Sequence, residues 1–388
     1  MAADTHRFHI PSRIVTGAGA SECVGTEARR LGAKKVLLVT DEGIVREGYP
    51  DQARERIVSE GIEVELFAGV TPDPTMKNVE DAVALFKAAG CDMVVSLGGG
   101  SSIDAGKATS VMATNPGSIR DYMGIEKFAY PGVPLIAMPT TCGTGSEVSM
   151  SDIITDTDRN VKMLIISYYV LPRVALVDPR FTLTLSREMT ATTAVDALTH
   201  AIEAYVSMKA QNITDTLALR AIELISGNLR QAWADNTNLE AKAATMLGAH
   251  LAGMAFSNSS VALVHGMSRP IGAYFHVHHG MSNAVLLERV MQFSLVGAPA
   301  RYARIAEAMG EEVRGLPPAE GAEKAVEAVG RLCKDVEIPT LSEIGITEDK
   351  LRPYIEQMAR DALASGSPAN NPRQATVEEI VQLYMDCL

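Results

Sequence analysis

Cysteine is scarce in this sequence, and no paired cysteine motif occurs. The 388 residues include five cysteines, which are scattered and never arranged as Cys-x-x-Cys. Neither a disulfide framework nor a thiolate zinc site is therefore indicated. A reducing compartment fits this cysteine usage best, so we expect a cytoplasmic protein.

Long apolar runs and an excess of positive charge are also absent. No stretch of 18 uninterrupted apolar residues occurs, and the N-terminus lacks a basic segment followed by an apolar run. Membrane spanning and export are thus both unsupported. Thirty-five Lys and Arg residues against 47 Asp and Glu residues give a net charge of −12, which disfavours a general phosphate-backbone or anionic-membrane surface. We expect neither nucleic acid nor a membrane as a partner.

What the sequence does contain is enough chain for two domains. Hydrophobic residues make up 47% and charged residues 21% of the 388 positions, the composition of a folded globular protein. The first half alternates short apolar runs with helical patterns, which predicts a parallel sheet covered on both faces. We expect one helix over residues 45–61. The expected strands cover 36–41, 64–69, 93–100, 134–139 and 174–179.

After about Leu185 the sequence changes to long stretches rich in Ala, Leu and Glu, with few β-branched runs. These stretches predict helices. We therefore expect an α/β domain over 1–185 and an all-helical domain over 186–388. The long helices are expected at 187–208, 213–234 and 239–256, with a last short helix after a loop at 365–376.

Two loops rich in glycine and hydroxyl groups follow expected strands, at the sheet edge where such folds bind ligands. The first loop opens a helical pattern, so its backbone amides are suited to a pyrophosphate at a helix N-terminus. A tight strand-to-helix turn with an N-cap explains the same residues. The first loop contains Gly98, Gly99, Gly100, Ser101 and Ser102, and the second runs from Thr140 through Thr141 and Thr144 to Ser146.

One carboxylate, Asp41, ends an expected strand at the same sheet edge. An acidic side chain there accepts hydrogen bonds from ribose hydroxyls and repels a 2′-phosphate. In the usual fingerprint this acid follows the glycine loop, whereas Asp41 precedes it. A helix N-cap is the alternative role for Asp41.

Six of the eight histidines lie between His200 and His279. Asp196 and His200 are four residues apart in a helical pattern, so they share one helix face. Together they suit a bound cation, and a buried ionic pair is the alternative.

Two further imidazoles would complete a metal site. His265 follows an apolar run, and Gly280 permits a turn beside a second group of histidines. One carboxylate with three imidazoles suits Fe(II) or Zn(II). Spacing alone leaves the fourth ligand open among His276, His278 and His279.

Ordered motifs over almost the whole chain resemble the iron-containing (group III) alcohol dehydrogenases, a branch of the dehydroquinate synthase-like fold. That fold joins a Rossmann-like N-terminal domain to an all-α metal-binding domain. The motifs are GGGSSIDAGKA (98–108), PTTCGTGSEVS (139–149), VDP (177–179), DALTHAIEAY (196–205), GMAFSN (253–258), VHGMSRPIGAYFHVHHGMSNAVLL (264–287) and NPR (371–373).

The resemblance implies roles for individual residues. It makes Asp196, His200, His265 and His279 the metal ligands and gives both glycine loops to the nucleotide. Further residues implied to contact the cofactor or its surroundings are Asp41, at the position associated with NAD preference, Asp73 and Lys162 in the cofactor cleft, and Phe256 near the nicotinamide.

One residue departs from the family pattern. Four residues after His265, where some members have a histidine proposed as a proton relay, this chain has Arg269. Arginine stays protonated and is not an ordinary proton relay near neutral pH. Arg269 either orients an anionic group of the substrate or pairs with a local acid.

The resemblance implies a metal-dependent alcohol dehydrogenase that transfers hydride between NAD(H) and a small primary alcohol or its aldehyde, diols and anionic aldehydes included. It further implies Fe2+ or Zn2+, an active-site cleft between two domains, and a homodimer or higher homo-oligomer. The alternatives are a dehydroquinate synthase-like or glycerol dehydrogenase-like enzyme and a non-enzymatic nucleotide-binding module.

Overall fold

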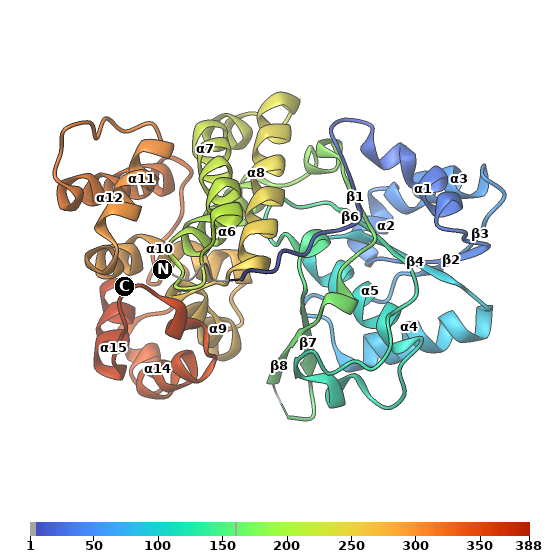
Figure 1. Ribbon diagram of the computed structural model, residues 1–388. Coiled ribbons are helices and arrows are strands. Elements are labelled where there is room, and N and C mark those ends of the chain that lie inside the picture. Colours follow the sequence, from blue (N-terminus) through green and yellow to red (C-terminus); the bar gives the residue numbers. More distant parts are fainter. Residues whose placement is uncertain (1–4, 160) are drawn as a thin grey trace. The chain divides into compact units, whose positions relative to one another are not determined.

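Residues 5–159 and 161–388 are described by the computed structural model, in which the chain folds as two units (Figure 1). One unit is His9–Leu183, and the other contains the described residues up to Phe8 together with Thr184–Leu388. The first unit holds the strands and the second consists of helices. The predicted fold class, an α/β domain joined to an all-α domain, is confirmed.

A six-stranded parallel sheet forms the core of His9–Leu183, with the order β1-β9-β6-β4-β2-β3. Five of these strands fall on predicted strands. The sixth, β1, was not predicted because it is four residues long and only partly buried, so it lacks the continuous apolar character of the others. The strands are β1 (Arg13–Thr16), β2 (Lys35–Val39), β3 (Glu63–Phe67), β4 (Met93–Gly98), β6 (Leu135–Pro139) and β9 (Val174–Val177).

Helices cover both faces of this sheet, as the apolar strands require. Val36 and Leu38 of β2 join a buried cluster on one face, and the alternate residues Leu37 and Val39 join a cluster on the other. The covering helices are α1 (Val24–Arg30), α3 (Tyr49–Val58), α4 (Met76–Ala89) and α5 (Gly100–Met112).

The single helix predicted over 45–61 is wrong, because the chain forms two helices there. The first is α2 (Glu42–Arg46), and α3 begins at Tyr49. Gly48 between them has φ 76, a left-handed conformation that glycine adopts at little cost. Pro50 then lies in the first turn of α3, where its missing N–H is tolerated.

A small second sheet was not predicted. It contains β5 (Gly124–Ile125), β7 (Ser151–Asp156) and β8 (Val161–Ile166), with β7 and β8 antiparallel. The pattern is hidden because two of the buried positions of β7 are Asp152 and Asp156. Asp156 is paired with Arg120 at 2.6 Å.

The helical unit is built around α6, which is buried along nearly its whole length and packs against α7, α8 and α10. A helix that is buried on all sides is typical of the centre of an all-α domain. The helices are α6 (Arg187–Val206), α7 (Asn212–Ala234), α8 (Leu239–Asn258), α9 (Leu263–Phe275), α10 (His279–Ser294), α11 (Pro299–Ala308), α12 (Pro318–Asp335), α13 (Glu348–Leu351), α14 (Ile355–Ala364) and α15 (Val377–Asp386).

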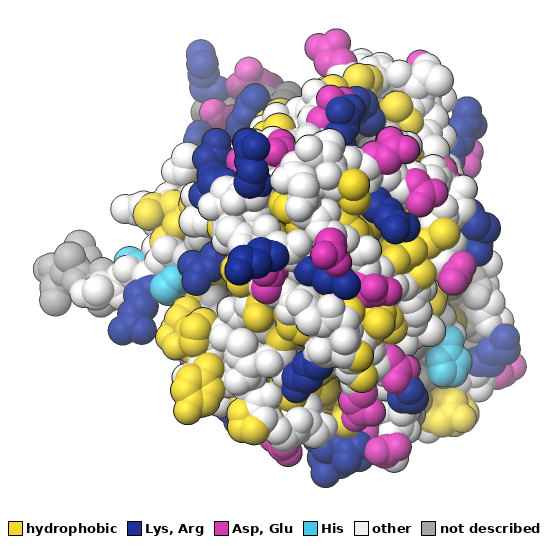
Figure 2. Space-filling model, turned by 90° about the vertical axis from the view of Figure 1, so that its right-hand side faces the viewer, with side chains coloured by type: hydrophobic (Ala, Val, Ile, Leu, Met, Phe, Trp, Pro, Cys, Tyr) yellow, Lys and Arg dark blue, Asp and Glu magenta, His cyan; other side chains and the backbone are white. Residues whose placement is uncertain are grey.

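Surface charge is mixed on the face shown in Figure 2, where Lys and Arg side chains are interspersed with Asp and Glu. Within the described residues, no helix taken singly has the length and apolar character needed to cross a membrane. The pair α8 and α9 meets that test only when joined, and the two helices are bent by 102° at the break between them.

Candidate active site

Four of the predicted ligand residues come together in the helical unit. Asp196 and His200 lie on α6, His265 is in the first turn of α9, and His279 begins α10. One ligand atom from each lies within 4.8 Å of the other three. Oδ1 of Asp196 is 3.9 Å from Nδ1 of His200, 3.6 Å from Nε2 of His265 and 3.9 Å from Nε2 of His279. We call these four residues the His/Asp cluster.

The His/Asp cluster is buried on one side and open on the other. The side chains of Asp196, His200 and His265 are 2%, 6% and 4% exposed, whereas that of His279 is 41% exposed. Phe256 of α8 stacks on His200, with ring centroids 4.3 Å apart and planes at 20°. Phe256 thus forms one apolar wall of the cluster.

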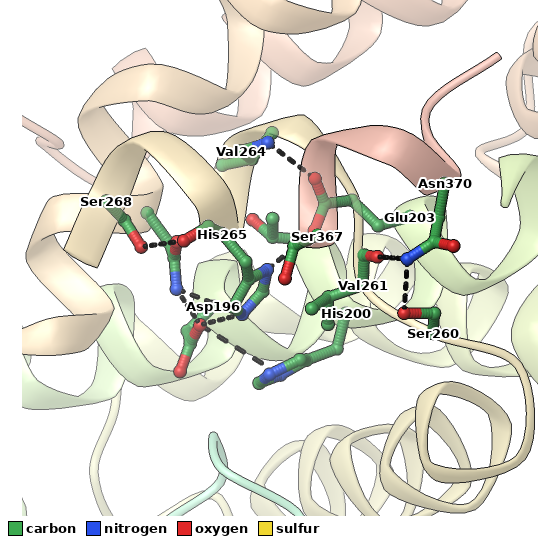
Figure 3. A network of polar contacts seen from close by, with 12 residues as sticks. Asp196, His200, Glu203, Ser260, Val261, Val264, His265, Ser268, Ser367 and Asn370 are labelled. Carbon is green, nitrogen blue, oxygen red and sulfur yellow. Dashed lines mark hydrogen bonds and ion pairs between the residues drawn. The ribbon is translucent and has the colours of Figure 1, made fainter. Parts of the chain in front are cut away.

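Glu203 contacts the ring nitrogen of His265 that faces away from Asp196. Its Oε2 lies 2.6 Å from Nδ1 of His265 (Figure 3), and an ionised carboxylate only accepts hydrogen bonds. The other ring nitrogen of His265, Nε2, faces Oδ1 of Asp196 at 3.6 Å.

Asn283 of α10 contacts three of the four residues of the His/Asp cluster. Its Nδ2 donates to Oδ1 of Asp196 at 2.6 Å and lies 3.2 Å from Nε2 of both His265 and His279. When both of these ring nitrogens are unprotonated, as metal ligands must be, one amide NH2 faces three acceptor atoms with two hydrogens. A cation satisfies such an excess of acceptors, and a carboxylate with three imidazoles suits Fe(II) or Zn(II). The residues present therefore fit the implied metal.

The electrostatics of the cluster follow from its burial and mutual contacts. Burial alone would raise the pKa of the Asp196 carboxyl, but His200, His279 and His265 outweigh it and the pKa lies well below its usual value. Burial would lower the pKa of the His265 imidazole, but Glu203 and Asp196 raise it. Asp196 is therefore an anion that stabilises positive charge beside it.

Glu203 and Asn283 were not found from the sequence. Glu203 is seven residues after Asp196 and three after His200, so it shares their face of α6. Asn283 is four residues after His279 on α10. Helical periodicity around each ligand candidate would have found both residues.

The turn near the histidine group is not made by the residue that we expected. Gly280 lies in the first turn of α10, and the left-handed residue is His276, with φ 56, at the end of α9. Gly280 instead permits a close approach, because a Cβ there would lie 2.9 Å from the carbonyl oxygen of Thr192 on α6. His276 and His278 are exposed, and neither belongs to the His/Asp cluster.

Arg269 lies one turn after His265 on α9. Its guanidinium donates to Oγ of Ser367 at 2.9 Å, in the short helix η7 (Ser367–Asn370). No ion pair joins Arg269 to an acid among residues 5–159 and 161–388. Burial lowers the pKa of Arg269, while Glu203 acts against this effect.

In the α/β unit, the two glycine loops and Asp41 lie together. β4 ends at Gly98, whose φ is 152, and α5 begins at Gly100. A Cβ on Gly100 would lie 2.7 Å from Cγ2 of Thr144, so the loops are in close contact. Further contacts join the residues predicted to bind nucleotide. Ser102 Oγ donates to Asp41 Oδ2 at 2.9 Å, and the Thr140 N–H donates to the Gly98 carbonyl oxygen at 2.9 Å. A Cβ on Gly99 would lie 3.5 Å from Thr141 Cγ2.

Asp41 also serves as a helix N-cap. Its Oδ1 accepts hydrogen bonds from the N–H groups of Gly43 at 2.9 Å and Ile44 at 3.1 Å, in the first turn of α2. The alternative role foreseen for this residue is therefore present, and a contact with ribose stays a prediction. Ser101 follows Gly100 in the first turn of α5, and no side chain caps that helix.

Asp73 and Lys162, both predicted to line a cofactor cleft, are paired with one another. Nζ of Lys162 on β8 is 2.7 Å from Oδ1 of Asp73. Asp73 has φ 55, a conformation that aspartate tolerates better than most residues. The side chains of Lys162 and Asp73 are 33% and 64% exposed, so this pair is accessible from solvent.

Family models match both units. The model for the Fe-containing alcohol dehydrogenase family, C-terminal, matches residues 190–388, and the model for iron-containing alcohol dehydrogenase matches residues 11–179. The chain belongs to the iron-containing alcohol dehydrogenase family. The resemblance seen in the motifs is confirmed, and with it the enzyme class: an oxidoreductase acting on alcohols and aldehydes, in a family that uses NAD(H) and Fe2+.

Relatives of known activity align with this iron-containing alcohol dehydrogenase over nearly its whole length. The 1,3-propanediol dehydrogenase of Klebsiella pneumoniae is 40% identical over 380 residues, or 97% of each chain. The NAD-dependent methanol dehydrogenase of Bacillus methanolicus is 40% identical over 382 residues, 98% of this chain and 99% of that one. A solved structure of 1,3-propanediol oxidoreductase has a TM-score of 0.97 and 39% identity, covering 99% of this chain and 100% of the other.

Proposed function

We propose that this enzyme interconverts a small primary alcohol and its aldehyde, with the His/Asp cluster holding Fe2+ and the glycine loops holding NAD(H). The observation that carries the proposal is the convergence of Asp196, His200, His265 and His279 within 4.8 Å of one another. When bound, the cation supplies Lewis acidity at the reacting oxygen.

The chain's own side chains fix the ligands and limit access to them. Glu203 holds the ring of His265, Asn283 donates to Asp196, and Phe256 stacks on His200. His279 is the ligand on the solvent side, with 41% of its side chain exposed. We infer that substrate approaches past His279, because the other three ligands are buried.

We infer that the nucleotide binds along the contacts between the loops in the α/β unit. The N–H groups at the start of α5 have no side-chain cap, which leaves them available to phosphate oxygens. Asp41 would accept from the ribose hydroxyls and disfavour a 2′-phosphate, so we propose NAD(H) over NADP(H). The residues proposed to bind the nucleotide or its surroundings are Asp41, Asp73, Gly98, Gly99, Gly100, Ser101, Ser102, Thr140, Thr141, Thr144, Lys162 and Phe256.

The substrate that we propose is a short alcohol. Relatives named 1,3-propanediol dehydrogenase and methanol dehydrogenase, both 40% identical, support short chains and diols. Arg269 adds a specific hypothesis. It is a charged donor near His265 that makes one side-chain hydrogen bond, to Ser367, so its remaining N–H groups are suited to a carboxylate, sulfonate or phosphonate on the substrate.

A substrate screen tests the proposal. Metal-free protein is reconstituted separately with Fe2+ and Zn2+ and offered small alcohols with NAD+, then neutral and anionic aldehydes with NADH. We expect NADH to accumulate in proportion to the alcohol consumed. Normal turnover in a verified metal-free protein would refute the assignment, and transient NADH without alcohol-dependent accumulation would indicate a lyase of the dehydroquinate synthase type.

We also propose a cytoplasmic homodimer, or a multiple of that dimer. The five cysteines form no disulfide, which supports a reducing compartment. Family membership supports the oligomer. Light scattering on purified protein checks the mass, and fractionation of the source cells checks the location.

A further inference from the structure

Glu203 is a buried carboxylate that the proposed metal site does not use as a ligand. Its residue is 2% exposed, and an isolated charge at such a position is costly unless its oxygens are hydrogen-bonded. Both oxygens are engaged by neighbouring residues of one segment. Oε1 accepts from the backbone N–H of Val264 and Oε2 from Nδ1 of His265, each at 2.6 Å (Figure 3).

We propose that Glu203 is a positioning residue for His265: it fixes the tautomer with hydrogen on Nδ1 and anchors the start of α9, so that Nε2 is aimed at the His/Asp cluster. This proposal rests on the metal-binding role proposed for that cluster. With the opposite tautomer, Nε2 would carry the hydrogen and no lone pair would be available to a cation.

The start of α9 depends on Glu203 because the helix has no cap of its own. Ala262, which precedes the helix, offers no side-chain hydrogen bond, although the first N–H groups of any helix lack intrahelical partners. Glu203 supplies the missing acceptor for Val264 from α6. Its negative charge also lies at the end of α9 where the helix dipole favours an anion.

A second contact holds the chain just before α9. Nδ2 of Asn370, in η7, donates to Oγ of Ser260 at 2.9 Å (Figure 3). The same Nδ2 also donates to the backbone carbonyl oxygen of Val261 at 3.4 Å, and neither bond reaches the imidazole of His265. Only Glu203, among the residues drawn in Figure 3, bonds to both the ring and the backbone at the start of α9. Asn370 therefore holds the loop before α9, whereas Glu203 also contacts the ring of His265.

The test compares Glu203→Gln with a control in the same unit. Glutamine has one acceptor oxygen, so its NH2 group would face either Val264 N–H or His265 Nδ1–H. Asp215→Asn is the matched control, because Asp215 pairs with Arg301 and belongs outside the His/Asp cluster. Affinity for Zn2+ and for anaerobic Fe2+ is measured by chelator competition, with thermal unfolding of the metal-free proteins and NADH titration alongside.

We expect Glu203→Gln to weaken binding of both metals about 10- to 100-fold, the range found when a hydrogen-bond partner of a metal-ligating histidine is lost. NADH affinity should stay within about twofold. Asp215→Asn should lower the unfolding temperature without changing metal affinity. Unchanged metal affinity in folded Glu203→Gln overturns the proposal, as does an equal loss of metal affinity in the control.

A measurement on the unaltered protein avoids dependence on folding of the variant. Spectra of metal-free protein labelled with 15N-histidine, assigned with His265→Gln, report the tautomer directly. At a pH where the imidazole of His265 is neutral, we expect its hydrogen on Nδ1, and a neutral ring with its hydrogen on Nε2 would overturn the proposal. If the unaltered protein binds no metal while its His265 tautomer is as expected, the proposed function fails and the orienting role of Glu203 stands.

Discussion

At the scale of single residues, the proposed ligand assignment separates neighbouring histidines that spacing alone does not distinguish. His279→Ala and His265→Ala should each lose metal and turnover while largely keeping NADH binding. Both residues are proposed metal ligands of the helical unit, whereas the glycine loops proposed to bind NADH belong to the α/β unit. His278→Ala, which alters an exposed neighbour, should retain metal. Metal content by elemental analysis and NADH fluorescence titration check these outcomes, and metal loss from the His278 variant would contradict the assignment.

Arg269 gives a second prediction at this scale. Arg269→Ala should lower kcat/KM for an anionic aldehyde about 100-fold, which is the effect of losing a charge-assisted hydrogen bond. The kcat/KM for a neutral aldehyde of equal length should change less than about threefold. Arg269→Lys should recover part of the difference because it keeps the charge. Equal losses for both aldehydes would exclude a role in anion selection.

Spacing in the sequence indicated the two candidate ligands of α6, because Asp196 and His200 share a helix face. Spacing left the fourth candidate open among His276, His278 and His279, and only the resemblance to the family motif selected His279. Their distances from Asp196 depend on how α10 packs against α6, which is a tertiary property. Glu203 and Asn283 were missed for a different reason: glutamate and asparagine are common on helices, and only the partner across the interface gives them a role.

At the scale of elements, the approach of α10 to α6 depends on Gly280. A Cβ at this position would lie 2.9 Å from the Thr192 carbonyl oxygen and 3.6 Å from Cβ of Asp196. Gly280→Ala should therefore displace His279, cost about 1 to 3 kcal/mol of stability and weaken metal binding. Gly227→Ala on α7, where nothing lies within 4 Å of the added Cβ, should stabilise by about 1 kcal/mol. Denaturant unfolding and metal titration compare the two variants.

Asp178 connects the end of β9 to the beginning of the α/β unit. Its buried carboxylate accepts from the N–H groups of Gly19 and Ser21, both at 3.1 Å, and pairs with Arg180 at 2.7 Å. Burial would raise the pKa of Asp178, but Arg180 and Ser21 lower it below its usual value. A depressed pKa means that this stabilisation is present above the unfolded pKa of about 3.9 and is lost as the pH falls through the lower folded pKa.

Asp178→Asn should consequently reduce the unfolding free energy at pH 7 by about 1 to 3 kcal/mol, the effect of leaving buried donors without their hydrogen-bond acceptor. The difference from the unaltered protein should shrink as the pH falls below about 4. Urea unfolding at several pH values, followed by a probe in the α/β unit, measures both effects. A difference independent of pH would show that ionisation of Asp178 contributes nothing.

The elements themselves were predicted unevenly. Continuous apolar runs identified five strands of the parallel sheet, because a strand buried on both faces leaves that signature. The hairpin of β7 and β8 was not predicted, because its buried acids, Asp152 and Asp156, break the alternation of apolar and polar residues expected of a strand. The split between α2 and α3 was missed at Gly48, where one left-handed residue ends a helical pattern that otherwise continues.

At the scale of the whole molecule, the two units should respond differently to loss of metal. A ligand at about 100 times its Kd stabilises the folded state by about 2.7 kcal/mol, and the proposed ligands all belong to the helical unit. Chelation should therefore increase amide hydrogen exchange in α6, α9 and α10 and leave β2, β4 and β6 unchanged. Exchange followed by mass spectrometry measures this, and uniform acceleration over both units would contradict it.

The double role of Asp41 has a consequence for coenzyme engineering. Replacement of Asp41 by alanine or glycine, which have no carboxylate to repel a 2′-phosphate, would also remove the hydrogen bonds that Asp41 accepts from the first turn of α2. Replacement of an N-cap by alanine costs about 1 kcal/mol, whereas replacement by glycine costs only a few tenths. Of these two, glycine is expected to alter coenzyme choice with the smaller loss of stability, and under the proposed function coenzyme preference is coupled to the stability of α2 at this one residue.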